Sequence, residues 1–326
     1  MRDGVPAMLG LIVRRILSLI PILLIVSFVV FMLTELVPGD AAVTIAGGAD
    51  ATPERIEQVR TQLGLDRPVF ERYGDWLSDA VQLDFGRSLL NQQGPTIAEE
   101  IETRLPITFS IAIAGLLISM LVGIPLGILS GLRPGAMVDR ASVTATSIGL
   151  AIPSFVVALF LINTFAINLG WFPALSNRYV PITEDPVEWM RWVALPALSI
   201  GIFAGASVAR QVRAAIIDTL QSNYVRTALS VGMGTRKTVV KYAFKNAAIP
   251  AVTVLGLQLS GLLGGVVIIE QIFSIPGLGT YLLRALTAPD VPVIQAVTLT
   301  FVVIHVLMNL VVDISYGYLN PRVRVA

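Results

Sequence analysis

Long apolar runs alternate with polar segments along most of the chain. The first run, from Ile16 to Leu33, contains no charged residue. With its flanking residues it is long enough to cross a hydrocarbon core of about 30 Å. A cleaved signal peptide is the alternative, but its apolar region would be only about 7 to 15 residues and would end at small residues. Five later runs are also long and predominantly apolar: Ile107 to Leu132, Ser142 to Leu169, Trp192 to Val212, Ala248 to Ile272 and Val291 to Tyr316. We therefore predict an all-α polytopic membrane protein with about six transmembrane helices.

One polar segment, residues 38–104, is long enough to hold helices of its own. Three helices are predicted, each from a different signal. In chain order the signals are an N-cap residue followed by proline, apolar residues at helical spacing, and a capping box. They are a helix from Pro53 to about Leu63, a helix over Val69 to Val81, and one opened by Thr96 and Glu99. The segment has few large apolar side chains, so we expect it to pack on the membrane spans rather than fold alone.

Composition supports a membrane protein and narrows the chemistry. Hydrophobic residues are 55% of the chain and charged residues only 14%, against about 25% in soluble domains. Without cysteine, neither disulfides nor thiolate metal sites can form. The single histidine, His305, is expected to be a packed or hydrogen-bonded residue of the last span. The nearest approach to a phosphate-binding loop, Gly232 to Thr238, has Arg236 where that motif requires glycine. We predict no catalytic, metal or cofactor site in this chain.

Lysine and arginine are unevenly distributed between the two sides of the predicted bundle. They predominate on the side that holds both termini, so the orientation rule places the termini in the cytoplasm. The expected divisions are residues 1–37 (cytoplasmic N-terminus and first transmembrane helix), 38–104 (external helical insertion), 105–316 (transmembrane core, with a cytoplasmic loop at 213–247) and 317–326 (cytoplasmic tail).

The cytoplasmic segment from Asn223 to Pro250 carries five basic residues and no acidic one. Its three lysines are spaced four residues apart, which places them on one face of a helix. Two interpretations remain open. The charge could simply fix the topology, or the segment could be where another protein docks. Gly232 would allow a turn within it, because glycine tolerates positive φ.

Polar, proline and glycine residues within the spans are a second group of candidates. Charges inside spans are costly, so Glu270 and Asp313 are expected near span ends, Asp313 with an interfacial or cytoplasmic partner. Glu270 is alternatively a gate or pathway residue, and the uncharged polar residues either line a wet cavity or bond helices together. The pathway candidates are Pro153, Ser154, Phe155, Asn163, Gln258, Ser260 and Glu270.

Prolines 125, 153 and 196 are expected to kink helices. Glycines four apart, at 123, 127 and 131, at 201 and 205, and at 261 and 265, allow close packing within this bundle or against a partner.

Nine short motifs in order along the chain resemble one family. They are Arg14-Arg15-Ile16 with Pro21, Leu36 to Asp40, Leu63 to Pro68, Asp84 to Ser88, Arg104 to Thr108, Gly123 to Gly127, Ile152 to Phe155, Pro276 to Gly279 and Asn320 to Val323. The sequence is similar to the first of the two permease types of oligopeptide, dipeptide and nickel ABC importers of bacteria. The resemblance implies a type I importer fold in the inner membrane, a second permease, two ATPase subunits that bind ATP and Mg, and an external solute-binding protein. It implies no nucleic acid partner.

The same resemblance places a short coupling helix in the basic segment, where it would fit a groove on an ATPase subunit. The residues assigned to it are Tyr224, Val225, Arg226, Thr227, Ala228, Gly232, Arg236 and Lys237. Related importers have glutamate where this chain has Arg226, so the ionic contact of that glutamate is not expected here. The implied cargo is a short peptide, with nickel, glutathione or another peptide-like solute as the alternative. A transporter driven by an ion gradient is a more distant alternative, since neither its coupling sites nor internal repeats are evident.

Overall fold

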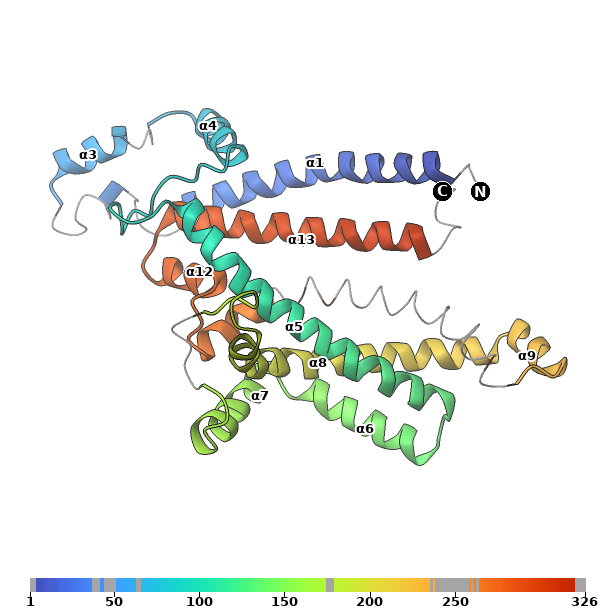
Figure 1. The fold of residues 1–326 in the computed structure, drawn as a ribbon. Helices are drawn as coiled ribbons and strands as arrows, with labels where there is room; N and C mark the ends of the chain where they lie inside the picture. Colours follow the sequence, from blue (N-terminus) through green and yellow to red (C-terminus); the bar gives the residue numbers. More distant parts are fainter. Residues whose placement is uncertain are drawn as a thin grey trace. The chain divides into compact units, whose positions relative to one another are not determined.

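The computed structural model describes residues 4–36, 42–43, 51–62, 66–173, 179–234, 237, 258, 261 and 264–319. Almost all regular structure in these residues is helical, apart from one isolated bridge between Arg87 and Thr96. The helices (Figure 1) are α1 (Gly4–Leu36), α3 (Pro53–Gln62), α4 (Val69–Val81), α5 (Ile97–Leu132), α6 (Met137–Ala151), α7 (Ser154–Leu161), the π-helix η2 (Ile162–Asn168), α8 (Pro186–Gln221), α9 (Asn223–Ser230), α12 (Leu278–Thr287) and α13 (Val291–Leu319). Residues 264–272 are also helical. The all-α prediction is confirmed.

Four helices are long and apolar enough to cross a membrane, and a bent pair makes up to five. The four spans are Arg14–Met32, Ile97–Leu132, Pro186–Gln221 and Val291–Ser315. The predicted span from Ala248 to Ile272 lies mostly outside the described residues, so the count of six is not tested by this structure.

Contacts divide the chain into two compact units. The first contains residues 1–15, 107–280 and 305–326, and the second contains residues 16–106 and 281–304. Several helices run from one unit into the other, and the sites below each lie within a single unit.

Helix α8 is the central helix of the first unit. In its most apolar part 72% of the residues are buried, compared with 33% in α5 and 17% in α13. The predicted glycines explain how α5 packs on it. A Cβ placed on Gly127 would lie 2.6 Å from the carbonyl oxygen of Ala209, and one on Gly123 would lie 2.6 Å from that of Gly205. Side chains cannot fit there, so glycine lets the two backbones approach closely.

These contacts decide the question that the glycine spacing left open for α5 and α8. Gly131 packs against Ile216, and Gly201 packs against Ile118. Both stripes therefore pack this chain's own bundle. A Cβ on Gly261 or Gly265 would meet no atom within 4 Å of those that the structure describes.

The predicted span from Ser142 to Leu169 is not one straight helix. Its two halves, Met137–Ala151 and Ser154–Asn168, meet at an angle of 93°. Proline was expected to kink this run, and Pro153 lies at the break, where it cannot donate a backbone hydrogen bond. Proline does not break the helix at Pro125 or Pro196, since α5 and α8 continue through both residues.

In the second unit, α4 packs on α1 through aromatic side chains, as Figure 1 shows for the helices. Phe28 stacks on Phe70 and meets Tyr73 edge to face, while Phe31 contacts Trp76. The Tyr73 hydroxyl lies 2.8 Å from that of Ser27. The expectation that the insertion packs on a membrane span is confirmed for this helix.

Two local predictions in the spans and the insertion are confirmed and one is wrong. In the capping box, the Thr96 amide donates to the Glu99 carboxylate (2.8 Å) and the Glu99 amide to the Thr96 hydroxyl (3.3 Å). Asp313 has its expected partner in Arg15, 2.8 Å away. His305 is exposed on α13 rather than packed in a core, because α13 buries little of its surface within this chain.

Candidate functional site

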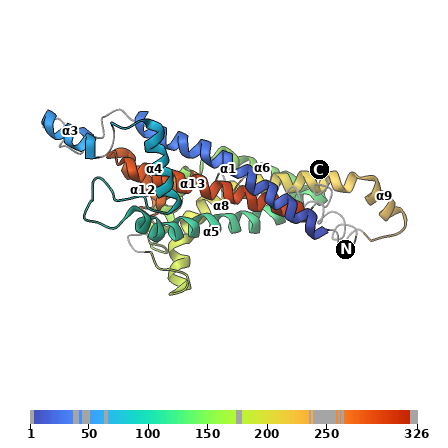
Figure 2. The same cartoon turned by 90° about the horizontal axis from the view of Figure 1, so that it is seen from above.

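The segment in which a coupling helix was predicted forms α9, a separate short helix that begins two residues after α8 ends. Both views show it at the far end of α8 (Figures 1 and 2). The corner is made by Ser222, which has extended backbone angles and closes α8 with a hydrogen bond from its amide to Thr219. Only Ser222 therefore separates α9 from α8, the most buried of the long apolar helices.

The faces of α9 separate the predicted residues into two groups. Val225 is fully buried and Ala228 is 7% exposed, so these two side chains hold α9 against its own chain. Tyr224, Arg226 and Thr227 are exposed. A partner can therefore reach the second group only. The resemblance alone, which assigned the whole stretch, could not make this distinction.

Gly232 ends α9 with the positive φ that was predicted for it. Its φ is +84°, and the Met233 amide donates to the Ala228 carbonyl at 3.1 Å. This six-to-one hydrogen bond is typical of the Schellman motif, in which the residue at the glycine position adopts a left-handed conformation. A Cβ at Gly232 would meet no atom within 4 Å. The requirement for glycine is therefore a matter of backbone conformation and not of space inside the bundle.

The remaining predicted coupling residues follow this turn. Lys237 is exposed. Arg236 lies outside the described residues, as does most of the basic stretch that follows.

A partly buried ion pair, between Arg213 and the buried Asp139, holds α8 ahead of α9, and sequence reasoning missed it. Arg213 on α8 binds Asp139 through two hydrogen bonds, Nε to Oδ1 at 2.6 Å and Nη2 to Oδ2 at 2.9 Å. Asp139, in the first turn of α6, also accepts from the Ser130 hydroxyl of α5 and from the Gly135 amide at 2.7 Å. The carboxylate thus joins α5, α6 and α8 at one point. The available signal was that Asp139 is the only acidic residue in the turn between Gly131 and Ser142.

The position of this ion pair relative to α9 is informative. Arg213 lies about 15 Å along α8 from the first residue of α9, at 1.5 Å rise per residue. A bidentate guanidinium and carboxylate pair has a fixed geometry. The pair therefore fixes α6 and the end of α5 to the last part of α8.

Glu270 was expected to reach the membrane interface near a span end, but its side chain is fully buried. One carboxylate oxygen accepts from the Thr108 hydroxyl at 2.6 Å, and the other accepts from the Thr280 amide at 3.0 Å. The Thr108 hydroxyl in turn accepts from the Leu278 amide at 2.9 Å. Glu270 and Thr108 therefore satisfy amides of the first turn of α12, where a negative charge is favourable.

Two glycines make room for this carboxylate. A Cβ on Gly277 would overlap the Glu270 carboxylate, and one on Gly279 would lie 2.9 Å from Glu270 Oε2. Before them, Ser274 has a positive φ of +51°, so the chain turns sharply between the helix that carries Glu270 and α12. Thr108, from the motif Arg104 to Thr108, and Gly277 to Gly279, from the motif Pro276 to Gly279, thus belong to one buried polar cluster.

The other pathway candidates are not brought into a cavity with Glu270 in the part of the chain that the structure describes. Pro153 and Phe155 are exposed at the bend before α7, and Ser154 is half-buried there. Asn163 is exposed on η2, and Gln258 is half-buried. Ser260 lies outside the described residues. A pathway role for these residues stays a prediction.

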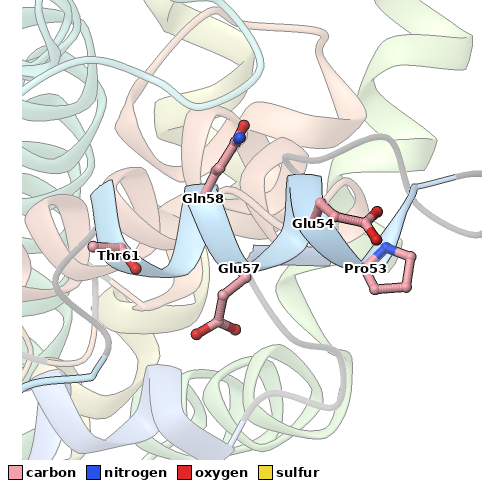
Figure 3. A pocket seen from close by; sticks show the side chains of 5 residues that line it. All are labelled: Pro53, Glu54, Glu57, Gln58 and Thr61. Carbon is pink, nitrogen blue, oxygen red and sulfur yellow. The ribbon is translucent and has the colours of Figure 1, made fainter.

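A hollow of about 830 Å³ lies beside α3, lined by Pro53, Glu54, Glu57, Gln58 and Thr61. In Figure 3, Gln58 and Glu57 point to opposite sides of the helix. Side chains that do not converge cannot position a ligand, so we assign no binding function to this hollow.

Comparison with known proteins identifies the family. Residues 123–325 match the family "Binding-protein-dependent transport system inner membrane component", and residues 8–112 match the N-terminal model of the same transport systems. The chain belongs to this family. It is a permease subunit of the ABC importer type, a multi-pass protein of the inner membrane, and the resemblance found in the sequence is confirmed.

Relatives and solved structures agree with the family. The chain is 38% identical to a putative peptide transport system permease protein of Brucella abortus (strain 2308), over 97% of this chain and 99% of that protein. It is equally identical, with the same coverage, to the glutathione transport system permease protein GsiC of Escherichia coli (strain K12). An inward facing structure of the MetNI methionine ABC transporter matches 68% of this chain and 96% of its own, with TM-score 0.53 and 16% identity. That match supports the type I importer permease fold.

Proposed function

We propose that this permease subunit forms half of the translocation pathway for short peptides and is driven by ATPase subunits that dock on α9. The observation that carries the coupling proposal is the geometry of α9. It follows the most buried span directly, buries Val225 and Ala228 against its own chain, and presents Tyr224 and Thr227 outward. A rigid helix seated in a partner's groove can transmit a rigid-body movement.

The proposed assembly contains this chain, a second permease of similar type, two ATPase subunits and an external solute-binding protein. ATP and Mg bind to the ATPase subunits, and this chain itself performs no catalysis. Both termini and α9 lie in the cytoplasm, and residues 38–104 lie outside. The distribution of lysine and arginine supports this orientation.

A peptide cargo is supported by the relative from Brucella abortus, which is named for peptide transport. Glutathione is the second candidate, because GsiC is as similar to this chain as that relative is. Glutathione is itself a small peptide, so a pathway for short peptides would suit both cargoes.

The proposed cargo and energy source are tested together with the purified complex and its solute-binding protein. Calorimetry of the binding protein should show binding of di- to tetrapeptides, with glutathione and nickel as separate arms. In proteoliposomes, uptake of the bound peptide should require ATP. Binding of nickel without peptide would overturn the cargo. Uptake driven by an ion gradient without ATP would overturn the importer mechanism.

A further inference from the structure

The ion pair of Arg213 and Asp139 provides the only hydrogen bonds between α6 and α8, two helices that the structure describes in full. Asp139 is 3% exposed, and its carboxylate also accepts from Ser130 on α5 and from the Gly135 amide before α6. A bidentate guanidinium and carboxylate pair fixes orientation as well as distance. Lysine in place of Arg213 would keep the charge and lose this fixed geometry.

The rest of the buried face of α6 holds the helix only weakly. Its buried residues are Asp139, Ser142 and Thr146, and none of the large apolar side chains of α6 is buried within this chain. The Thr146 hydroxyl donates to carbonyls of α6 itself. Gly149 lies against Ala206 of α8, where a Cβ would come within 3.3 Å. Small residues allow close approach but make few van der Waals contacts each, so the ion pair is what fixes α6 on α8.

Helix α6 connects this ion pair to the break at Pro153. It lies beside α8 (Figure 1) and ends at Ala151. The chain then turns by 93° into the segment that begins at Ser154. This bend carries Pro153, Ser154 and Phe155, three of the residues predicted to line the pathway. The ion pair itself lies near the end of α8 that leads into α9, and all of these segments belong to the first unit.

We propose that the ion pair of Arg213 and Asp139 transmits the movement of α9 to α6, and through α6 to the bend at Pro153. The proposal rests on the proposed function, in which ATPase subunits move α9. Because Ser130 binds the same carboxylate, the end of α5 moves with α6 and α8 as one body. Arg213 and Asp139 are therefore positioning residues, which contact neither cargo nor ATP.

The test uses the full complex in proteoliposomes and measures peptide uptake and ATP hydrolysis in the same sample. Arg213→Lys should lower the uptake per ATP hydrolysed about fivefold, a size typical of residues that carry coupling between two sites. ATP hydrolysis should continue, because ATP binds to other subunits. Asp139→Asn should have a similar effect. The double variant should be no worse than either single variant, as expected for two residues that act through one contact.

Arg15→Lys is the matched control. Arg15 pairs with Asp313 of α13 at 2.8 Å, so the same change is made in an ion pair of the first unit that does not involve α8. It should keep the wild-type uptake per ATP. The proposal is overturned if Arg213→Lys also keeps it, or if Arg15→Lys lowers it as much. It is equally overturned if uptake and hydrolysis fall in the same proportion, as a loss of folded complexes would produce.

A second measurement follows α6 directly. Spin labels on Val138→Cys of α6 and Gln211→Cys of α8 occupy exposed positions in a chain without native cysteine. Their distance should be the same with and without a bound ATP analogue in the otherwise wild-type complex, and should change with the analogue in Arg213→Lys. The same behaviour in both backgrounds would overturn the proposal. Uptake by the wild-type complex without ATP would instead overturn the proposed function, and this proposal with it.

Discussion

Replacing Gly232 with tryptophan is expected to abolish most ATP-driven uptake while the transmembrane bundle remains assembled. Gly232 holds φ at +84°, and a Cβ placed on it would meet no atom within 4 Å, so the change does not disturb the packing of α5 on α8. A side chain makes the left-handed conformation unfavourable by about 1–2 kcal/mol. The end of α9 would then shift or unwind, and the groove of the ATPase would receive a helix of different shape. Uptake and ATP hydrolysis measured in the same proteoliposomes give the coupling ratio.

Two control variants separate backbone conformation from side-chain bulk. Gly234→Trp adds the same side chain two residues later, where a Cβ also meets nothing and glycine does not hold a positive φ. It should retain coupling. Gly232→Asn should retain more coupling than Gly232→Trp, because asparagine tolerates positive φ better than most residues. Full transport and full cargo-stimulated ATPase activity in Gly232→Trp would contradict the role given to this turn.

Replacing Glu270 with alanine is expected to destabilise the bundle and loosen α12. The change removes the acceptor of the Thr280 amide and of the Thr108 hydroxyl, which are both buried. Each buried polar group left without a partner costs about 1–3 kcal/mol. Glu270→Gln keeps one acceptor oxygen and should be affected less. Thermal inactivation of the detergent-solubilised complex measures the difference.

A second pair of variants tests the same cluster from its glycine side. Gly277→Ala should resemble Glu270→Ala, because the added Cβ overlaps the carboxylate. Gly264→Ala adds the same methyl group to the helix that carries Glu270, at a position with nothing within 4 Å, and should be tolerated. If Glu270→Ala and Gly277→Ala are as stable as the wild type, the cluster does not hold α12.

Features that depend on neighbouring residues were predictable from the sequence. The capping box of Thr96 and Glu99, the helix from Val69 to Val81 and the positive φ of Gly232 each follow from residues a few positions apart. The break at Pro153 was anticipated as a kink, but its angle of 93° was not.

Features that join distant residues could not be predicted in this way. Thr108 and Glu270 are 162 positions apart, so neither residue indicates the other. For the same reason Glu270 looked like a charge that would reach the interface, although it is fully buried. The spacing of Gly123, Gly127 and Gly131 indicated that another helix packs closely against this face of α5. Only the structure showed that this helix is α8.

The most direct test of coupling through α9 uses the absence of cysteine from this chain. A single cysteine introduced on α9 can carry a photoactivated cross-linker without any change elsewhere in the subunit. Thr227→Cys, on the exposed face, should cross-link to an ATPase subunit, whereas Val225→Cys, at a fully buried position, should not. Tyr224→Cys is a second variant on the exposed face and should cross-link as Thr227→Cys does. Equal cross-linking from Thr227→Cys and Val225→Cys would contradict docking through the outer face of α9. So would the absence of cross-linking from both Thr227→Cys and Tyr224→Cys.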